Sequence, residues 1–447
     1  MDTINIWALL TPVALGLLIF ELLYSLIAKR GVYTFQESIA NMGTAIGNQT
    51  MNLLVAALVY TSFGYLHAQY ALFDIPNTWW SFLALFLLVD FLFYWFHRAG
   101  HRVNILWAAH MPHHSAEEMN LAVGLRASIT QRLFSFSFFL PIPFLGFDPH
   151  FMYMTIGLHL IMGYWHHTEV IRTLGWFEKW FNTPSHHRVH HGTNAQYLDK
   201  NYAEFLILWD KLFGTFEPED EPVCYGVLDP TRSWNPLYIN FQHWIKLARM
   251  TAATPFWSEK LKLWFMPPSY VPRGLPADFA KNFTDSPGMT REEQIRYLSH
   301  MFCGAKPYLV TQMIAGIGFM VFVIDGKSPL SGWEKFGFSL LIWAMVVAWS
   351  GILERRRWTA ALEITRLFAM AGALFYGFTK YGVLSSIAPE ALAAGLFGFA
   401  SISAAYTIAF FRGGVPAEER FAMESTESHN SELNRGDAVT PELGAVA

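Results

Sequence analysis

Long apolar runs alternate with shorter polar segments along most of this 447-residue chain. A helix needs about 20 apolar residues to cross the hydrocarbon core of a bilayer. The pattern predicts membrane helices at 5–27, 50–70, 79–97, 132–147, 150–166, 308–324, 336–353, 366–385 and 391–411. The fourth and fifth runs are short and are split at Asp148-Pro149, so we expect a hairpin that does not cross fully. Polar Thr61, Ser62 and His67 weaken the second run. The predicted fold is an all-α, polytopic membrane helical bundle.

The polar segments divide the chain into five predicted regions. These are N-terminal spans (1–78), a histidine-rich region (79–216), a polar segment (217–305), four further spans (306–412) and a tail (413–447). The polar segment has Pro-rich turns beside aromatic-rich pieces at Trp234–Trp244 and Phe256–Phe265, which predict amphipathic helices lying at the membrane interface. The tail is rich in Glu, Ser and Asn, a composition typical of disorder.

Basic residues near the ends of the predicted spans indicate their orientation. Cytoplasmic loops carry an excess of Lys and Arg. Lys29 and Arg30 follow the first span, which places the N-terminus outside and the end of the third span, near Arg102, in the cytoplasm. The basic run Arg355–Arg357 and Arg412 then fall on the same side. We therefore expect the histidine-rich region at the cytoplasmic face of a bacterial inner membrane or of the endoplasmic reticulum.

Composition supports this layout and excludes several classes of protein. Hydrophobic residues make up 53% and charged residues 15% of the chain, against about 25% charged in a soluble domain. The formal charge of −4 gives no indication of nucleic-acid binding. Two cysteines, Cys224 and Cys303, are too few for a disulfide framework or a four-thiolate metal cluster. The N-terminus lacks the basic segment of a cleaved signal peptide, so the first run is expected to be a retained anchor.

Three histidine boxes carry the candidate chemistry. Thirteen of the 17 histidines lie between His97 and His191. The boxes have the spacings H-x3-H, H-x2-H-H and H-x2-H-H, and their members are His97, His101, His110, His113, His114, His187, His190 and His191. Histidines four apart share one face of a helix and can reach a single ion. Imidazole binds iron, zinc and copper, and eight rings are too many for one ion. The pattern predicts two metal ions rather than a set of solvated surface histidines.

The positions of the remaining histidines distinguish one further candidate ligand from residues that are not expected to bind metal. His167 ends the hairpin and is expected to complete the ligand set. His166 and His186 are interpreted as neighbours of better candidates, and His159 as a buried histidine with its own partner. We expect no metal ligand at the other five, which are His67, His150, His243, His300 and His429.

Several carboxylates are candidates to support the metal-binding rings. A metal-bound imidazole usually donates its second N–H to a carboxylate, carbonyl or water. Asp90 precedes His97 by two helical turns inside an apolar span, where a carboxylate is costly and usually functional. Further candidates flank the boxes, and each is equally interpretable as a solvated acid: Glu118, Asp199, Glu204 and Asp210. Glu21 lies in the first apolar run, and the sequence assigns it no site. We expect no catalytic side chain beyond the metal ligands.

The box order and the flanking residues resemble the fatty acid hydroxylase/sterol desaturase superfamily of membrane di-iron oxygenases, in particular its glyceryl-ether-cleaving members. The resemblance is densest over residues 79–245. It is carried by Val89-Asp90 through Tyr94–Arg98, Val103–Trp107, His113-His114-Ser115, His167–Val170, Asn182–Gly192 and Asp199–Tyr202 through Trp209–Phe216.

The resemblance implies a cofactor set and a reaction. The eight box histidines match the family's metal ligands, and His167 matches a further histidine of its pattern. Two iron ions, O2 and tetrahydrobiopterin as reductant would hydroxylate the carbon next to the ether oxygen of an alkylglycerol lipid, releasing a fatty aldehyde and a glycerol derivative. The similar animal enzymes have Glu where this chain has Arg102, which puts the pterin dependence in doubt.

Three alternatives remain open at this point. The same metal centre could hydroxylate or desaturate a sterol, a fatty acyl chain or another membrane lipid, with a different electron donor. A histidine-rich metal transporter would place its ionisable groups near the bilayer midplane, whereas these boxes lie at the ends of spans. A haem protein needs fewer paired histidines than this chain has.

Overall fold

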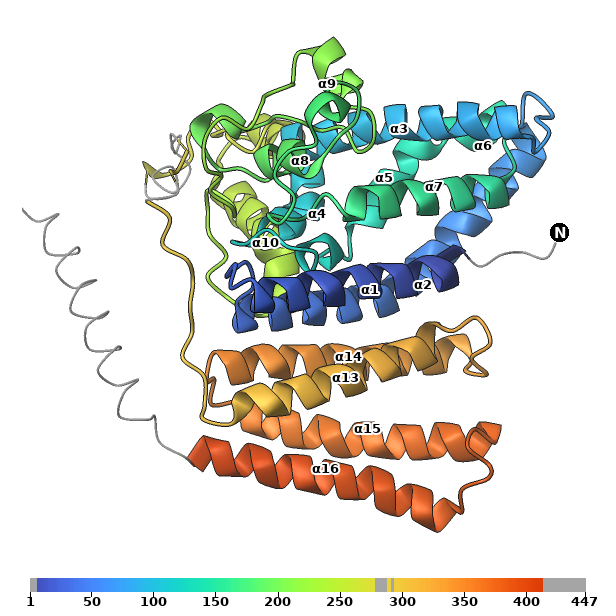
Figure 1. The fold of residues 1–447 in the computed structure, drawn as a ribbon, viewed down its shortest axis with the longest axis vertical. Helices are drawn as coiled ribbons and strands as arrows, with labels where there is room; N and C mark the ends of the chain where they lie inside the picture. Colours follow the sequence, from blue (N-terminus) through green and yellow to red (C-terminus); the bar gives the residue numbers. More distant parts are fainter. Residues whose placement is uncertain (1–5, 278–287, 291–292, 413–447) are drawn as a thin grey trace, which may run out of the picture. The chain divides into compact units, whose positions relative to one another are not determined.

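The computed structural model describes residues 6–277, 288–290 and 293–412, and every regular element in that part of the chain is a helix (Figure 1). One isolated antiparallel bridge, between Gly192 and Tyr225, is the single β pairing among the described residues. The predicted all-α fold is confirmed. The tail at 413–447, predicted to be disordered, lies outside the described residues.

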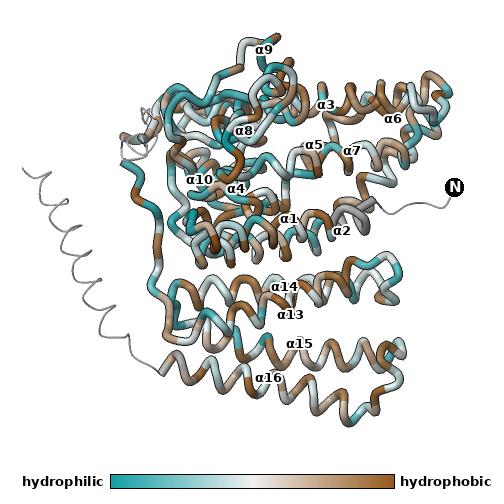
Figure 2. Tube along the Cα trace, in the orientation of Figure 1, coloured by the Kyte–Doolittle hydropathy of each residue, from teal (hydrophilic) through white to brown (hydrophobic). Residues whose placement is uncertain are grey.

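Five of the described helices are long and apolar enough to cross a membrane. They are α3 (Trp79–Arg102), α13 (Ala305–Ile324), α14 (Gly332–Leu353), α15 (Thr359–Tyr381) and α16 (Pro389–Arg412). A sixth span results if the two parts of α2 (Phe35–Tyr70), which meet at a bend of 43°, form one broken span. Brown, hydrophobic stretches run along these helices in Figure 2, while teal is frequent around α8 and α9. The chain is an integral membrane protein.

The nine predicted spans are too many for the described residues. Residues 132–147 form two short helices, α5 (Gln131–Phe139) and α6 (Pro141–Leu145), because the two prolines of α6 lack the N–H groups that would continue α5. Helix α7 (Pro149–Tyr164) then begins after Asp148, whose side chain accepts a hydrogen bond from the Phe151 amide. None of the three is long enough to span, in line with the predicted incomplete hairpin.

Helix α2 begins at Phe35, well before the predicted start at residue 50. Its first half carries Asn41, Thr44 and Asn48, and all three are buried. Hydropathy alone therefore left this half outside the predicted span, because its polar residues hide a helix that is buried in the protein. Helix α1 (Ile6–Ile27) covers the predicted first run, but its part at Pro12–Ile27 is an apolar helix shorter than the five candidate spans.

The chain divides into two compact units. Residues 1–298 and 311–351 form the first, and residues 299–310 and 352–447 form the second. In the first unit, a core cluster joins α2, α3 and the hairpin helices through Phe63, Leu85, Val89, Ile142 and Met152. The second unit packs α15 against α16. The predicted four-span region 306–412 is therefore shared between the units.

Four further helices of the first unit surround the histidines. They are α4 (Asn104–His114), α8 (Pro184–His190), α10 (Pro236–Ala253) and α11 (Trp257–Phe265), with α9 (Leu208–Phe213) nearby in the sequence. Helices α10 and α11 pack on α4 and on each other. The two aromatic-rich pieces of the polar segment are thus helical, as predicted, and they brace the helix that bears the second box.

Candidate metal centre

The first two boxes meet at the corner between α3 and α4. His97 and His101 occupy the last turns of α3, and the chain turns at Val103 before α4 starts. Asn104 fixes this corner, since its backbone N–H donates to Met266 O and its side-chain amide donates to Leu263 O at 2.8 Å. The corner folds α4 back so that its histidines face those of α3.

Helix α4 presents three histidines at positions i, i+3 and i+4. His110 and His114 lie one turn apart and face His97 and His101, with Nε2 atoms 3.0 Å and 3.2 Å apart in the two facing pairs. His113 points to a different set of rings. One short helix therefore contributes to two neighbouring groups of ligands.

The third box lies on α8, a helix of seven residues that begins with Pro184 at its first position. Proline suits this position because its missing N–H would have had no helical partner. The side-chain amide of Asn182 donates to Ala203 O at 2.7 Å and holds the start of the helix. His190 faces the first group of rings, and His187 faces the second.

The nine histidines predicted as ligands come together in two groups. In each group every ring offers one nitrogen, and these nitrogens all lie within 4.8 Å of one another. The five-histidine group contains His97, His101, His110, His114 and His190, and the four-histidine group contains His113, His167, His187 and His191. The groups adjoin, since the His114 and His191 rings stack with centroids 4.3 Å apart. The structure thus splits the boxes between groups rather than giving each box its own ion.

The protonation pattern of the rings favours a cation in the four-histidine group. Nδ1 of His113 contacts Arg126 O at 3.0 Å, and Nδ1 of His167 contacts Tyr164 O at 3.2 Å. A carbonyl oxygen can only accept, so in each neutral ring Nδ1 carries the hydrogen and Nε2 keeps a bare lone pair. The two Nε2 atoms nevertheless face each other at 3.2 Å. Two lone pairs repel at this distance, and a metal ion between them removes the repulsion.

The five-histidine group is arranged in the same way. His97 Nδ1 contacts Tyr202 O at 2.7 Å, and His190 Nδ1 contacts Lys200 O at 3.0 Å. Their Nε2 atoms point to His110 and His114. Backbone carbonyls therefore select the tautomer that leaves Nε2 free for a metal.

The loop that supplies two of these carbonyls has an unusual backbone. Asp199 and Asn201, on either side of Lys200, adopt positive φ angles of 60° and 53°. Asn and Asp tolerate this region better than other non-glycine residues. The Asn201 side chain donates to His186 O and Glu217 O and accepts from the Glu217 amide. These bonds fix the turn that directs the carbonyls of residues 200 and 202 at two rings.

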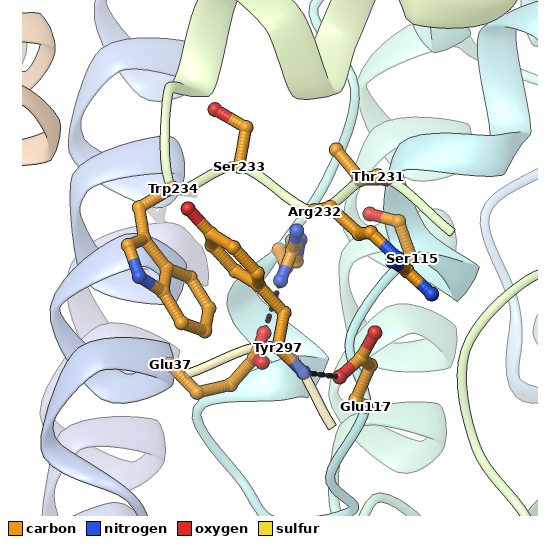
Figure 3. A pocket seen from close by; sticks show the side chains of 9 residues that line it. Glu37, Ser115, Glu117, Thr231, Arg232, Ser233, Trp234 and Tyr297 are labelled. Carbon is orange, nitrogen blue, oxygen red and sulfur yellow. Dashed lines mark hydrogen bonds and ion pairs between the residues drawn. The ribbon is translucent and has the colours of Figure 1, made fainter. Parts of the chain in front are cut away.

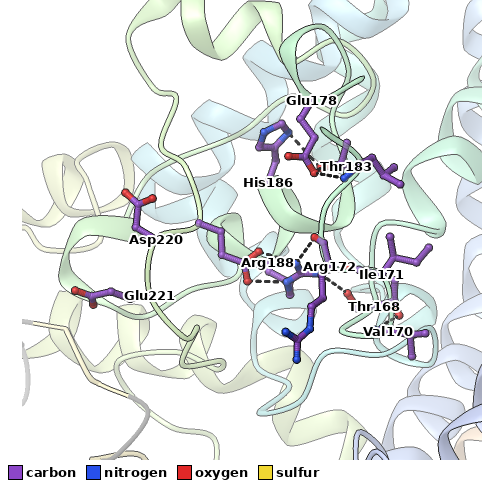
Figure 4. A network of polar contacts seen from close by, with 12 residues as sticks. Thr168, Val170, Ile171, Arg172, Glu178, Thr183, His186, Arg188, Asp220 and Glu221 are labelled. Carbon is purple, nitrogen blue, oxygen red and sulfur yellow. Dashed lines mark hydrogen bonds and ion pairs between the residues drawn. The ribbon is translucent and has the colours of Figure 1, made fainter. Parts of the chain in front are cut away.

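Arg188 holds the third box against the segment that follows His167 (Figure 4). Its buried guanidinium donates to the carbonyls of Thr168, Ile171 and Arg172 at 2.7–2.8 Å and to the carboxylate of Glu219. His187 and His167 come from opposite sides of this junction. Arg188 therefore sets the distance between two members of the four-histidine group.

Burial keeps the candidate metal-binding rings of α4 and α8 neutral. It lowers the pKa of His113 to about 4, with the Arg126 carbonyl partly opposing the shift. The pKa values of His110, His114, His187, His190 and His191, and that of His167, are well below 6.5, chiefly through burial and then through neighbouring histidines. Neutral rings are the form that binds metal.

The metal-free protein should lose stability as the pH falls below about 6.5. The folded-state pKa values are lowered, so the unfolded chain binds more protons between pH 6.5 and the folded pKa. Each such histidine then costs roughly 1.4 kcal/mol per pH unit. Thermal unfolding of chelator-treated protein should shift to lower temperature from pH 7 to pH 5. A melting temperature that does not change over this range would contradict the assignment of neutral, buried rings.

The predicted supporting carboxylates have different surroundings. Asp90 accepts from His159, from the amides of Phe205 and Leu206, and from the Trp209 indole, all at 2.8–3.1 Å. None of these four donors is a box histidine, and the Tyr202 carbonyl takes the place at His97 that the sequence assigned to Asp90. The reason is that the 205–209 segment brings three donors to this carboxylate.

Asp199 and Glu204 lie on either side of the same loop. Asp199 has one carboxylate oxygen 3.9 Å from His101 Nδ1 and the other 2.6 Å from the Arg102 guanidinium. Asp199 thus forms an ion pair with a box histidine when that ring is protonated. Glu204 is buried against Gly163 of α7, and burial followed by the charge of Asp90 raises its pKa to about 8. A support role for either residue stays a prediction.

Three other acidic residues stabilise the backbone around the histidine groups by accepting hydrogen bonds. Asp210 accepts from the amides of Tyr202 and Ala203 at 2.8 Å, which steadies the carbonyl that His97 uses. Glu118 accepts from the Thr34 amide. Glu21, to which the sequence assigned no site, accepts from the Leu121 amide and from the hydroxyls of Tyr33 and Thr168, so it ties α1 to the segment next to His167.

The histidines not expected to bind metal lie outside both groups. His159 donates to Asp90, His166 contacts Asn182, and His243 contacts Asn104. His186 is near Thr183 and stacks edge-on against Phe216. His67, His150 and His300 belong to neither group, and His429 lies outside the described residues.

A small cavity is lined by charged and aromatic side chains, among them Glu37, Glu117, Arg126 and Trp234 (Figure 3). Its volume of about 10 Å³ is enough for one water molecule. Glu37 of α2 and Arg126 form a buried ion pair on its wall, and Glu117 accepts from the Tyr297 amide at 2.6 Å. The Arg126 carbonyl is also the partner of His113. The ion pair therefore holds the residue whose carbonyl orients the His113 ring. Nothing in the sequence indicates this role for Arg126.

Comparison with known proteins gives consistent results. The sequence profile described as fatty acid hydroxylase matches residues 82–215, which contain all nine histidines. The chain is 31% identical to the human alkylglycerol monooxygenase over 90% of this chain and 86% of that protein. It is 32% identical to the Xenopus tropicalis alkylglycerol monooxygenase, covering 83% and 82% of the two chains. A 28% identity to an ornithine lipid hydroxylase of Rhizobium tropici covers 45% and 58%. No solved structure matches.

Proposed function

This chain belongs to the fatty acid hydroxylase family and is an oxidoreductase of the monooxygenase class, and we propose that it is a di-iron enzyme that cleaves ether lipids. The proposed reaction hydroxylates the carbon next to the ether oxygen of an alkylglycerol lipid. One atom of O2 enters the C–H bond, and the other is reduced to water by two electrons from a reductant. The resulting hemiacetal separates into a fatty aldehyde and a glycerol derivative.

The observation that carries this proposal is the pair of adjoining all-imidazole groups. Their nine nitrogens match the preference of iron, copper and zinc for imidazole. Zinc has no redox chemistry and so does not suit a monooxygenase. Two ferrous ions would be held by the five-histidine and four-histidine groups and would supply the activation of O2. The protein's own residues orient the rings and exclude water.

Water exclusion and ring orientation can be traced to named residues. Eight of the nine ligand rings are buried, and His113 is partly buried. Carbonyls of Arg126, Tyr164, Lys200 and Tyr202 each fix one ring through Nδ1. Such outer partners typically change metal affinity or activity by about 10- to 100-fold when they are lost. No side chain is required as a nucleophile or as a general base in this scheme.

The position of the centre suits a bond close to the lipid headgroup. His97 and His101 are in the last turns of a helix that is long enough to span the bilayer. The ether bond of an alkylglycerol lies where headgroup and alkyl chain meet. A centre at the end of a span can reach this bond without drawing the whole tail out of the membrane. We propose that this end faces the cytoplasm, as the basic loops predict.

The proposed electron donor is a reduced pterin that would act at the edge of the five-histidine group. Tetrahydrobiopterin is the reductant implied by the family likeness, but Arg102 is basic where the similar animal enzymes are acidic. In the structure Arg102 binds Asp199, which lies beside His101. This ion pair keeps an acidic group at the edge of the five-histidine group despite the reversed charge at residue 102. Pterin use therefore stays within the proposal.

The test is turnover by protein purified without oxygen, after metal quantification. We expect about two iron ions per chain, and release of a fatty aldehyde from an alkylglycerol when O2 and tetrahydrobiopterin are added. Parallel reactions should offer a sterol, a fatty acyl lipid and a chemical reductant in place of the pterin. Hydroxylation or desaturation of one of those lipids, with the alkylglycerol untouched, would establish the alternative substrate class. Failure to consume O2 with any lipid would overturn the proposal.

A further inference from the structure

Helix α11 presents an outer face of large apolar side chains that no described residue covers. Phe256, Trp257, Leu261 and Phe265 are 55%, 79%, 65% and 66% exposed. We propose that this face lies in the boundary between headgroups and acyl chains of an anionic membrane leaflet. The proposal concerns how the enzyme sits on its membrane, and it does not depend on which lipid is oxidised.

The charges of α11 are sorted in a way that suits anionic lipid. Its single acid, Glu259, is turned inward with a fully covered side chain. It accepts from the Tyr270 hydroxyl and pairs with Lys262 at 3.3 Å and with Arg273 at 3.0 Å. The outer side therefore carries cations without a free acid, and Lys260 lies over the Trp257 ring. Apolar residues flanked by cations are typical of helices that lie in the interface.

The place of α11 in the fold gives an independent reason for a lipid partner. Asn104, just after the end of α3, is hydrogen-bonded to Leu263 O and Met266 O of α11 and its C-cap. Because α3 is long enough to span the bilayer, its end marks the level of the membrane surface. A helix joined to this end lies at the same level. Nine residues extend about 13 Å, too short to cross the bilayer, so α11 lies along it.

A second copy of the chain is the competing occupant of this face. Two copies would bring Lys260, Lys262 and Arg273 of one against the same cations of the other in a symmetric contact. Like charges repel in such an arrangement, whereas anionic lipid headgroups attract Lys260 and add to the pairing that Glu259 gives Lys262 and Arg273, whose side chains are 48% and 78% exposed. Charge complementarity therefore favours the bilayer.

The experiment places an environment-sensitive fluorophore at Leu261→Cys in a Cys303→Ser background. Cys224 is buried and can be left in place. The full chain is reconstituted into nanodiscs of phosphatidylcholine and phosphatidylglycerol, some with a nitroxide on the acyl chain near the headgroup. A matched label at Asp220→Cys serves as control, because Asp220 is exposed within the acidic run Glu217–Glu221.

We expect the label at residue 261 to shift to the blue and to be quenched about threefold more by the lipid nitroxide than the label at residue 220, since interfacial helices bury about 5–10 Å deep. The double substitution Lys260→Glu and Lys262→Glu should reduce this quenching in anionic discs, with a smaller effect in neutral discs. Equal quenching at both sites would overturn the proposal. Energy transfer between labels on two copies, with no lipid quenching, would assign the face to a second copy instead.

Discussion

Replacing His190 with alanine is expected to abolish lipid oxidation, with turnover reduced at least about 100-fold. His190 supplies one of the five nitrogens of its group, and its Nε2 is 3.2 Å from that of His114. Its loss opens a position in the five-histidine group and removes a ring that the Lys200 carbonyl orients. His187→Ala should have the same effect through the four-histidine group. The measurement is turnover together with metal content per chain.

His186→Ala is the matched control for both substitutions. His186 lies on the same short helix but belongs to neither group. Its loss should leave metal content and turnover close to those of the parent protein. Insertion of all three variants into the membrane should be normal, since the ligands lie outside the apolar core of the spans. Full turnover by His190→Ala and His187→Ala, with unchanged metal content, would refute the ligand assignment.

Replacing Arg188 with alanine is expected to destabilise the protein and to weaken the four-histidine group selectively. The substitution removes the donor for three backbone carbonyls and leaves the carboxylate of Glu219 without its partner. Breaking a buried ion pair by removing one side typically costs about 3–5 kcal/mol. The loop that carries His167 should then move away from α8, so that metal content falls toward half before it is lost altogether. Thermal unfolding and metal analysis of the same sample measure both effects.

Arg172→Ala provides the control at the same junction. The Arg172 side chain is exposed, and only its backbone carbonyl takes part in the network. This variant should unfold at nearly the parent temperature and keep its metal. Arg188→Lys should fall between the two, because an ammonium group cannot reach all of the acceptors that the planar guanidinium contacts. If Arg188→Ala matched Arg172→Ala in both measurements, the junction would not control the four-histidine group.

The sequence was sufficient to select the nine histidines that the structure gathers into two groups, because spacing and residue chemistry coincide there. Histidines three and four apart share a helical face, and this local rule placed His110, His113 and His114 on α4 without any tertiary information. The pairing of rings across boxes was not predictable in this way. His113 joins His167, His187 and His191, whereas its neighbours join α3. That division depends on the corner at Asn104, which is fixed by carbonyls far away in sequence.

Hydropathy predicted the membrane spans with a similar limit, since it detects contact with lipid but not burial against protein. Hydropathy located the long helices α3 and α13–α16, because lipid contact requires uninterrupted apolar surface. It missed the start of α2, where Asn41 and Asn48 are buried against protein. Hydropathy also predicted one continuous helix at 132–147, whereas the prolines of α6 break this run into two short helices.

The sequence by itself predicted an all-helical membrane protein with nine imidazoles of the type and spacing that suit a metal site, because hydropathy and side-chain chemistry are properties of the residues. The tertiary structure alone decided which rings meet, which of their nitrogens is free, and what holds them. The partners of Nδ1 are carbonyls of Arg126, Tyr164, Lys200 and Tyr202. Every residue has a backbone carbonyl, so the sequence cannot show which carbonyls orient the rings. Only their positions in the folded chain decide this.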